Sequence, residues 1–377
     1  MKNYLFSIVI GCVLISIAGC KRDDDEPERE RKPISRLYVS TSDYSAGSAA
    51  QTIPNVWVLD NVDQEELPGR EFLRSFISNA KGGRMIHYSP FNGGRLFQGS
   101  MNPRSDLDTA IHTMTISKIG VLNNASSLGN RKYDNVRGLY YTVENEGKLT
   151  DDFLLFTNAS DTTKGTPPDQ PPVANYSLFV IQRPRSSGRL SLPRYTMKLS
   201  HNPWAVLAID RDLVISRAEE KNAAIVVYRQ FMNRLMQNGD STIKEVDHYE
   251  LKIPDAKNLR GISYSKSADI LMVTDFSQST SVTTPGNVGR ILIFEKFSQY
   301  KAAQDITPTR IIEGDLTKLR EPTDVAIDGK AGGKYFFVAD PVTRRVLRFS
   351  ISDQGNVAPK ELNFDNRPPW SISLDSR

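Results

Sequence analysis

Five β-rich segments of the chain each begin with an arginine or a tryptophan, and these side chains offer the clearest binding chemistry in the sequence. A guanidinium can form two parallel hydrogen bonds with a carboxylate or a phosphate, and an indole supplies an apolar plate with one N–H donor. If all five segments start at the same end of the fold, their side chains would surround an anionic or sugar-like ligand. The residues are Arg137, Trp204, Arg260, Arg320 and Trp370.

The same residues also have a purely structural interpretation, which the sequence leaves open. A tryptophan at the start of a strand can pack against the neighbouring repeat, and an arginine can pair with an acidic turn residue. The acidic residues placed to do so are Asp210, Asp275, Asp328 and Asp340.

The segments belong to a repeat of short strands. Near the C-terminus, residues 322–328, 334–340, 345–350 and 359–364 are β-rich runs separated by turns that contain Gly, Asp or Pro. This pattern is typical of an antiparallel meander. The unit resembles an NHL repeat, which forms one four-stranded blade of a β-propeller. The same order recurs upstream in units that begin near residues 84, 136, 202 and 259.

The two ends of the chain indicate how the ring closes. Residues 368–375 match the opening of the unit at Asn202, yet the chain stops directly after them. Runs that could complete this blade lie at residues 36–40 and 55–59. A C-terminal strand that joins the N-terminal blade removes the exposed edges of the sheet. We therefore predict an all-β fold, a six-bladed propeller over residues 34–377, with about 57 residues a blade; five or seven blades remain alternatives.

Four long loops are expected to gather on one face of this ring. They join the second and third strands of their units and are rich in Ser, Thr, Gly and Pro, a composition typical of exposed functional loops. They would surround the end of the axis at which the arginines and tryptophans lie. The loops span residues 43–54, 100–109, 158–175 and 276–289.

The N-terminal segment predicts export and a lipid anchor. Lys2 precedes an apolar stretch, and Ile17-Ala18-Gly19 stands before Cys20, a pattern typical of a secretory signal. With Cys20 as the first mature residue, residues 1–19 resemble a bacterial lipoprotein signal, which implies lipidation of Cys20. Residues 20–33 are charged and should form a solvated tether. Their acidic run resembles the surface-export signal of Bacteroidetes lipoproteins, so we expect an outer-membrane protein that faces outwards, with the plain spacer as the alternative.

Composition excludes several classes of function. The formal charge of +4 includes Lys2 of the leader, and no long basic run follows it, so nucleic acid is not an expected partner. The chain has two cysteines, Cys12 and Cys20, so the propeller itself has neither disulfides nor thiol chemistry. We expect a monomeric domain.

Enzyme signatures are sparse. The resemblance to six-bladed lactonases of the gluconolactonase type would imply a divalent metal held by inner-strand Glu, Asn and Asp residues. Glu321 precedes Pro322 without the expected context, and the four histidines do not supply a three-histidine zinc set. Asp210, Asp328 and Asp375 leave a calcium site as an alternative to turn capping. We expect no cofactor and a module that binds a glycan or a protein; the alternative is a metal-dependent hydrolase or lactonase.

Overall fold

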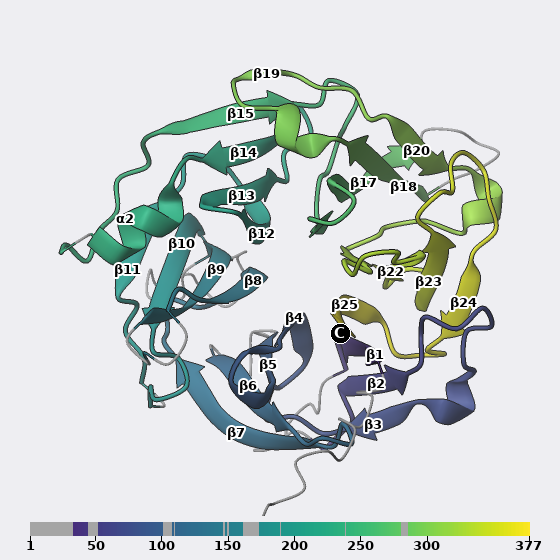
Figure 1. Ribbon diagram of the computed structural model, residues 1–377, viewed down its shortest axis with the longest axis horizontal. Coiled ribbons are helices and arrows are strands. Elements are labelled where there is room, and N and C mark those ends of the chain that lie inside the picture. Colours follow the sequence, from purple (N-terminus) through teal and green to yellow (C-terminus); the bar gives the residue numbers. More distant parts are fainter. Residues whose placement is uncertain are drawn as a thin grey trace, which may run out of the picture. The chain divides into compact units, whose positions relative to one another are not determined.

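The computed structural model describes residues 33–43, 52–100, 108, 110–145, 148, 151–160, 173–188, 190–237, 239–279 and 286–377. Their strands form six antiparallel sheets arranged as blades around an axis, so the predicted six-bladed β-propeller is confirmed (Figure 1). In each blade the strands follow one another from the axis outwards.

The first three blades come from the N-terminal half of the chain and the C-terminal strand. Blade 1 consists of β25 (Pro369–Ser376), β1 (Ser35–Thr41), β2 (Val56–Asp60) and β3 (Arg74–Phe76). Blade 2 consists of β4 (Gly83–Ser89), β5 (Arg95–Ser100), β6 (Ala110–Ile116) and β7 (Leu122–Gly129). Blade 3 consists of β8 (Val136–Val143), β9 (Asp152–Ser160), β10 (Ala174–Gln182) and β11 (Tyr195–Lys198).

The other three blades follow in chain order. Blade 4 consists of β12 (Pro203–Ile209), β13 (Asp212–Arg217), β14 (Ala224–Tyr228) and β15 (His248–Lys252), with the two-residue strand β19 (Gln304–Asp305) added in parallel at its edge. Blade 5 consists of β16 (Ile262–Ser265), β17 (Ile270–Ser279), β18 (Gly286–Glu295) and β20 (Arg310–Glu313). Blade 6 consists of β21 (Asp324–Ile327), β22 (Tyr335–Asp340), β23 (Arg345–Ser350) and β24 (Lys360–Asn363).

The ring closes as the split repeat predicts. The last strand, β25, pairs with β1 from Ser35 opposite Ser376 to Ser40 opposite Ser371. The backbone N–H of Ile34 also donates to the carbonyl of Arg377 at 2.6 Å. The first and last described strands, β1 and β25, therefore share one sheet, and β25 is its innermost strand.

Helices are short connections between strands. In the described ranges, the α-helix α2 (Phe231–Gln237) and the 3₁₀ helix η5 (Phe297–Gln299) lie between the third and fourth strands of their blades. Within the described ranges, no helix has the length and apolarity needed to cross a membrane. The other 3₁₀ turns are η1 (Arg70–Phe72), η2 (Phe91–Gly93) and η6 (Asp315–Thr317).

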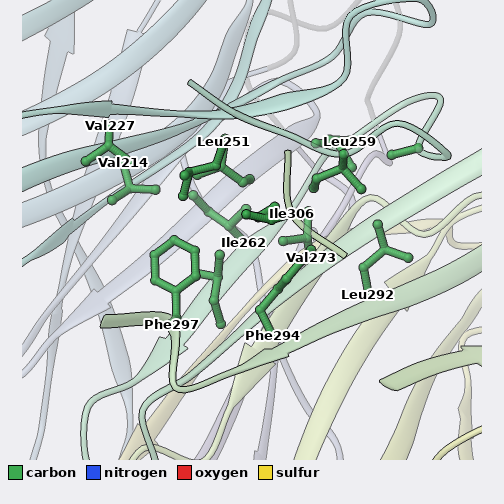
Figure 2. Close-up of a cluster of buried hydrophobic side chains, with 14 of the residues drawn as sticks. Val214, Val227, Leu251, Leu259, Ile262, Val273, Leu292, Phe294, Phe297 and Ile306 are labelled. Carbon is green, nitrogen blue, oxygen red and sulfur yellow. The ribbon is translucent and has the colours of Figure 1, made fainter. Parts of the chain in front are cut away.

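Neighbouring blades pack through buried aliphatic and aromatic side chains. The cluster between blades 4 and 5 is an example: Val214 and Leu251 of blade 4 share it with Leu292 and Phe294 of blade 5 (Figure 2). Since each sheet is covered on both faces, a middle strand can bury the side chains of both its faces, as in β14, where all five residues are buried. Burying one such side chain contributes about 1.5–3 kcal/mol.

Candidate functional site

In four blades a β-bulge near the start of the inner strand turns one side chain towards the same end of the axis. In β8, Val136 pairs with Asn158 and Gly138 with Thr157, so Arg137 has no partner across the ladder. A bulge of this kind redirects the extra residue and bends the strand. The same shift in register occurs beside Arg84, Trp204 and Trp370.

Hydroxyl groups of the second strands satisfy the backbone groups that the bulges leave unpaired. The N–H of Ala205 donates to the Ser216 hydroxyl at 2.9 Å, and the N–H of Gly261 donates to the Thr274 hydroxyl at 2.8 Å. Ser216 then donates to the carbonyl of Arg260 in the next blade at 2.6 Å. Because a buried backbone donor without a partner is costly, these hydroxyls stabilise the bulges.

Glycine at two positions lets the inner strands approach closely. A Cβ atom on Gly138 would lie 2.7 Å from the carbonyl oxygen of Trp204, and one on Gly261 would lie 2.4 Å from the Cα atom of Asp324. Any larger residue would push neighbouring blades apart at this level. Each glycine directly follows an arginine that the bulge turns towards the axis.

Five redirected side chains form one group, which we call the Arg–Trp cluster: Arg84, Arg137, Trp204, Arg260 and Trp370. The two indoles stack with their ring centroids 6.5 Å apart and their planes 28° apart. The guanidinium carbon of Arg84 lies 4.0 Å from the centroid of Trp370, and those of Arg137 and Arg260 lie 4.8 and 4.5 Å from the centroid of Trp204. A guanidinium over an indole at these distances is a stabilising cation–π contact.

The cluster carries more positive charge than its described neighbours neutralise. Arg260 pairs with Glu321 at 2.7 Å, and Arg137 donates to the side-chain carbonyl of Asn202 at 2.7 Å. Among the described residues, Arg84 has neither a hydrogen bond nor an ion pair, so three guanidiniums share one carboxylate. The buried Nη1 of Arg260 and Nε1 of Trp204 also lack acceptors there.

Burial and mutual repulsion both act on these cations. Burial, together with the charges of Arg137 and Arg260, lowers the pKa of Arg84 to about 10. Burial and the charge of Arg260 lower the pKa of Arg137 to about 10. Burial also lowers the pKa of Arg260, although Glu321 opposes this effect. The groups remain protonated at neutral pH, and a bound anion would relieve both costs.

The structure brings together four of the five residues that the sequence singled out. Arg320 is the exception: its backbone N–H donates to Asp340 at 2.6 Å, and its guanidinium makes no hydrogen bond, ion pair or ring contact with a described residue. Arg84 takes its place in the cluster. The sequence contained one indication of this role for Arg84. It lies near the start of the second repeat unit, as Arg137 lies near the start of the third.

The structural interpretation of these residues holds only in part. Both tryptophans do pack, but against each other across the axis rather than only within a neighbouring blade. The cluster arginines do not pair with the acidic turn residues: Asp275 pairs with Arg290 at 2.8 Å, and Asp210 pairs with Lys266 at 2.7 Å.

The other sequence candidates do not converge. His112 contacts Asp108 at 3.0 Å in blade 2. His201 lies 3.6 Å from Glu245, and this pair belongs to blade 4. Across the part of the chain that the structure describes, no three His, Cys, Asp or Glu side chains are placed to hold one metal ion. Asp328 caps a turn by accepting from the N–H of Lys330, and Asp375 pairs with Arg377 at 2.7 Å. Cys20, the tether and the central parts of the four long loops lie outside the described residues.

Comparisons with known proteins identify the fold and no family. No family model and no curated protein matches the chain. A chain of a nidogen–laminin complex is 12% identical with a TM-score of 0.54, over 90% of this chain and 98% of that one. A putative 6-phosphogluconolactonase from Bacteroides uniformis ATCC 8492 is 10% identical with a TM-score of 0.53, over 91% of this chain and 99% of that one. At such low identity these similarities show the propeller fold alone.

Proposed function

We propose that this propeller is a binding module for an acidic glycan, held by the Arg–Trp cluster. The observation that supports the proposal is the convergence of Arg84, Arg137 and Arg260 on a stacked indole pair beside a single carboxylate. A uronic acid unit supplies the carboxylate that the guanidiniums lack.

The energetics favour an anion over a neutral sugar. Each hydrogen bond to a charged group contributes about 1.5–3 kcal/mol, and the unpartnered Nη1 of Arg260 and Nε1 of Trp204 provide donors that are already buried. A neutral sugar would stack on the indoles but would leave the positive charge uncompensated.

Tryptophan fluorescence can test this proposal directly. The chain has three tryptophans, so a Trp57→Phe background leaves only Trp204 and Trp370 as reporters. Titration with oligogalacturonate should change the emission saturably, whereas the matching neutral galactose oligomer should not. Arg84→Gln should weaken binding at least tenfold.

The matched control is Arg194→Gln, because Arg194 also lies over an aromatic ring, 4.6 Å from the centroid of Tyr195, but on the outside of blade 3. The affinity of the Arg194→Gln variant for oligogalacturonate should equal that of the Trp57→Phe background. Equal binding of acidic and neutral oligomers, or no binding of either, would refute the proposal.

A lactonase is the second candidate, and one observation favours it. The structural neighbour from Bacteroides uniformis is described as a putative 6-phosphogluconolactonase, and a phosphorylated sugar lactone is an anion that the Arg–Trp cluster could hold. Hydrolysis of 6-phosphogluconolactone above the spontaneous rate, with and without added calcium or magnesium, would favour this candidate. Binding without turnover would favour the first.

We also propose that the module works at the outer membrane, attached through a lipid on Cys20 and exposed at the cell surface. The support is the sequence pattern of residues 1–33. Cys20→Ala should move the protein from the membrane fraction to the soluble fraction, and protease should digest the anchored protein on intact cells. Retention of the variant in membranes would contradict the anchor.

A further inference from the structure

A cavity of about 360 Å³ lies within the ring and receives side chains from all six inner strands. Its lining begins one residue beyond the Arg–Trp cluster, at Gly138 and Ala205, and continues along the strands to Asp210 and Lys266. Those last two residues are exposed, so the cavity opens at the end of the axis opposite the cluster.

About half of the lining is aliphatic. The inner strands contribute Leu139, Val206, Ile262, Val325 and Ile372, each buried. A pocket of this volume that combines apolar walls with polar groups is typical of a site for a small organic molecule.

Most polar side chains of the lining are already engaged. The Ser263 hydroxyl accepts from the N–H of Ile327 at 3.1 Å, and the Ser373 hydroxyl accepts from the N–H of Tyr88 at 2.8 Å. The Tyr264 hydroxyl donates to Asp269 at 2.8 Å. Asp324 accepts from Ile372 and Ser371.

His87 and Tyr140 are different, because neither side chain has a hydrogen-bonding partner among the described residues. They come from adjacent inner strands, β4 and β8, and their ring centroids are 5.5 Å apart. The ring encloses both side chains, yet each keeps some accessible surface. Because both line the cavity, this surface faces the interior of the cavity. A molecule in the cavity would meet in them two polar groups that no described residue engages.

Both groups are uncharged at neutral pH. Burial lowers the pKa of His87 to about 4 and raises the pKa of Tyr140 to about 12. A neutral imidazole offers one donor and one acceptor, and the phenol offers one of each. Neither group offers a charged ligand a counter-ion in exchange for its lost hydration, and the carboxyl group of Asp324 in the same lining is already engaged by Ser371 and Ile372.

We infer that the axial cavity binds a small uncharged molecule with one polar end, such as a phenol or an alcohol. Its hydroxyl exchanges hydrogen bonds with His87 and Tyr140, and its apolar body fills the aliphatic part of the lining. This site is separate from the Arg–Trp cluster and does not depend on the function proposed for that cluster.

Phenol is a suitable probe, because it is neutral below pH 9 and small enough for the cavity. The ring C–H signals of the four histidines can be followed by NMR during a phenol titration, with His87 assigned through His87→Gln. We expect a saturable shift for His87 and none for His248, whose side chain lies at the outer edge of blade 4.

Tyr140→Phe removes only the hydroxyl and should weaken the phenol affinity about fivefold. Tyr335→Phe, the same change on a strand away from the cavity, should leave it unchanged. If Tyr140→Phe unfolds, Ile209→Phe offers a second test, since Ile209 lines the cavity beside the opening and the added ring should block entry. The inference would be overturned if the His87 signal shifted without saturating as phenol is added, or if the His87 and His248 signals shifted equally.

Discussion

Replacing Asp324 with Asn should remove a large part of the pH dependence of the protein's stability between pH 5 and pH 8. Asp324 lies in the inner strand of blade 6. Its Oδ2 accepts from the N–H of Ile372 at 3.0 Å and from the Ser371 hydroxyl, and its Oδ1 accepts from the N–H of Val325 at 2.9 Å. Burial raises the pKa of this carboxyl from 3.8 to about 7, although the three hydrogen bonds oppose the rise.

The sign of the effect follows from the difference between the folded and unfolded pKa. The folded protein holds the proton of Asp324 more tightly than the unfolded chain does. The contribution of Asp324 to the free energy of unfolding is therefore fully present below pH 4 and is lost as the pH rises towards 7. With pKa values of 3.8 and about 7, the loss between pH 5 and pH 8 amounts to about 2–3 kcal/mol.

An asparagine has the same shape but does not titrate. Its amide replaces one acceptor with a donor, which costs about 1–3 kcal/mol at every pH. The stability difference between wild type and Asp324→Asn should therefore be largest at pH 5 and shrink by about 2–3 kcal/mol at pH 8. Other titrating groups affect both proteins equally and cancel in this difference.

Urea unfolding of both proteins at pH 5, 6, 7 and 8 measures this difference. Ser371→Ala provides an independent check, because loss of the hydroxyl donor should raise the pKa of Asp324 further and extend the fall in stability to higher pH. Parallel stability curves for wild type and Asp324→Asn would show that the buried carboxyl does not titrate in this range.

Three further predictions concern the ring and the cluster. Gly261→Ala should destabilise the protein by about 2 kcal/mol or more in urea unfolding, because the new methyl group would meet Asp324, whereas Gly188→Ala, with open space around it, should cost less than about 1 kcal/mol. Arg84→Gln should raise the melting temperature in low salt without ligand, since it removes a buried like charge; a lower melting temperature would indicate that its contact with Trp370 outweighs the repulsion. Deletion of residues 369–377 should abolish cooperative unfolding, because blade 1 loses its inner strand; a sharp transition in circular dichroism would contradict this.

The fold was predictable from the sequence because a propeller blade is built from local pairings. Within a blade, most strands pair with the next one along the chain, so short β-rich runs and turn residues identify blades without knowledge of distant contacts. The pairing between the two ends of the described chain, β25 with β1, was predicted from incomplete repeats at the two ends, and the register from Ser35 to Ser376 confirms it. The long-range pairing of β19 with β15 was not predicted.

The site was less predictable because it depends on the register within the inner strands. The sequence placed Arg137, Trp204, Arg260 and Trp370 at strand starts, and the cluster contains all four. It could not show the bulges, which are a matter of hydrogen-bond pairing rather than composition. For the same reason the sequence pointed to Arg320, which precedes β21 and does not join the cluster, and did not point to Arg84, which does.

The bulges also explain how one ring could contain two kinds of binding chemistry along its axis. A strand alternates its side chains between two faces, so one extra residue near the start breaks the alternation once. In blade 5, Arg260 and Gly261 both bond to Thr274, and regular pairing resumes at Ile262 opposite Val273. The residues before this break point to the end of the axis that holds the Arg–Trp cluster, and those after it line the axial cavity. In the four blades with a register shift, one extra residue is therefore sufficient to separate the proposed anion site from the proposed cavity site.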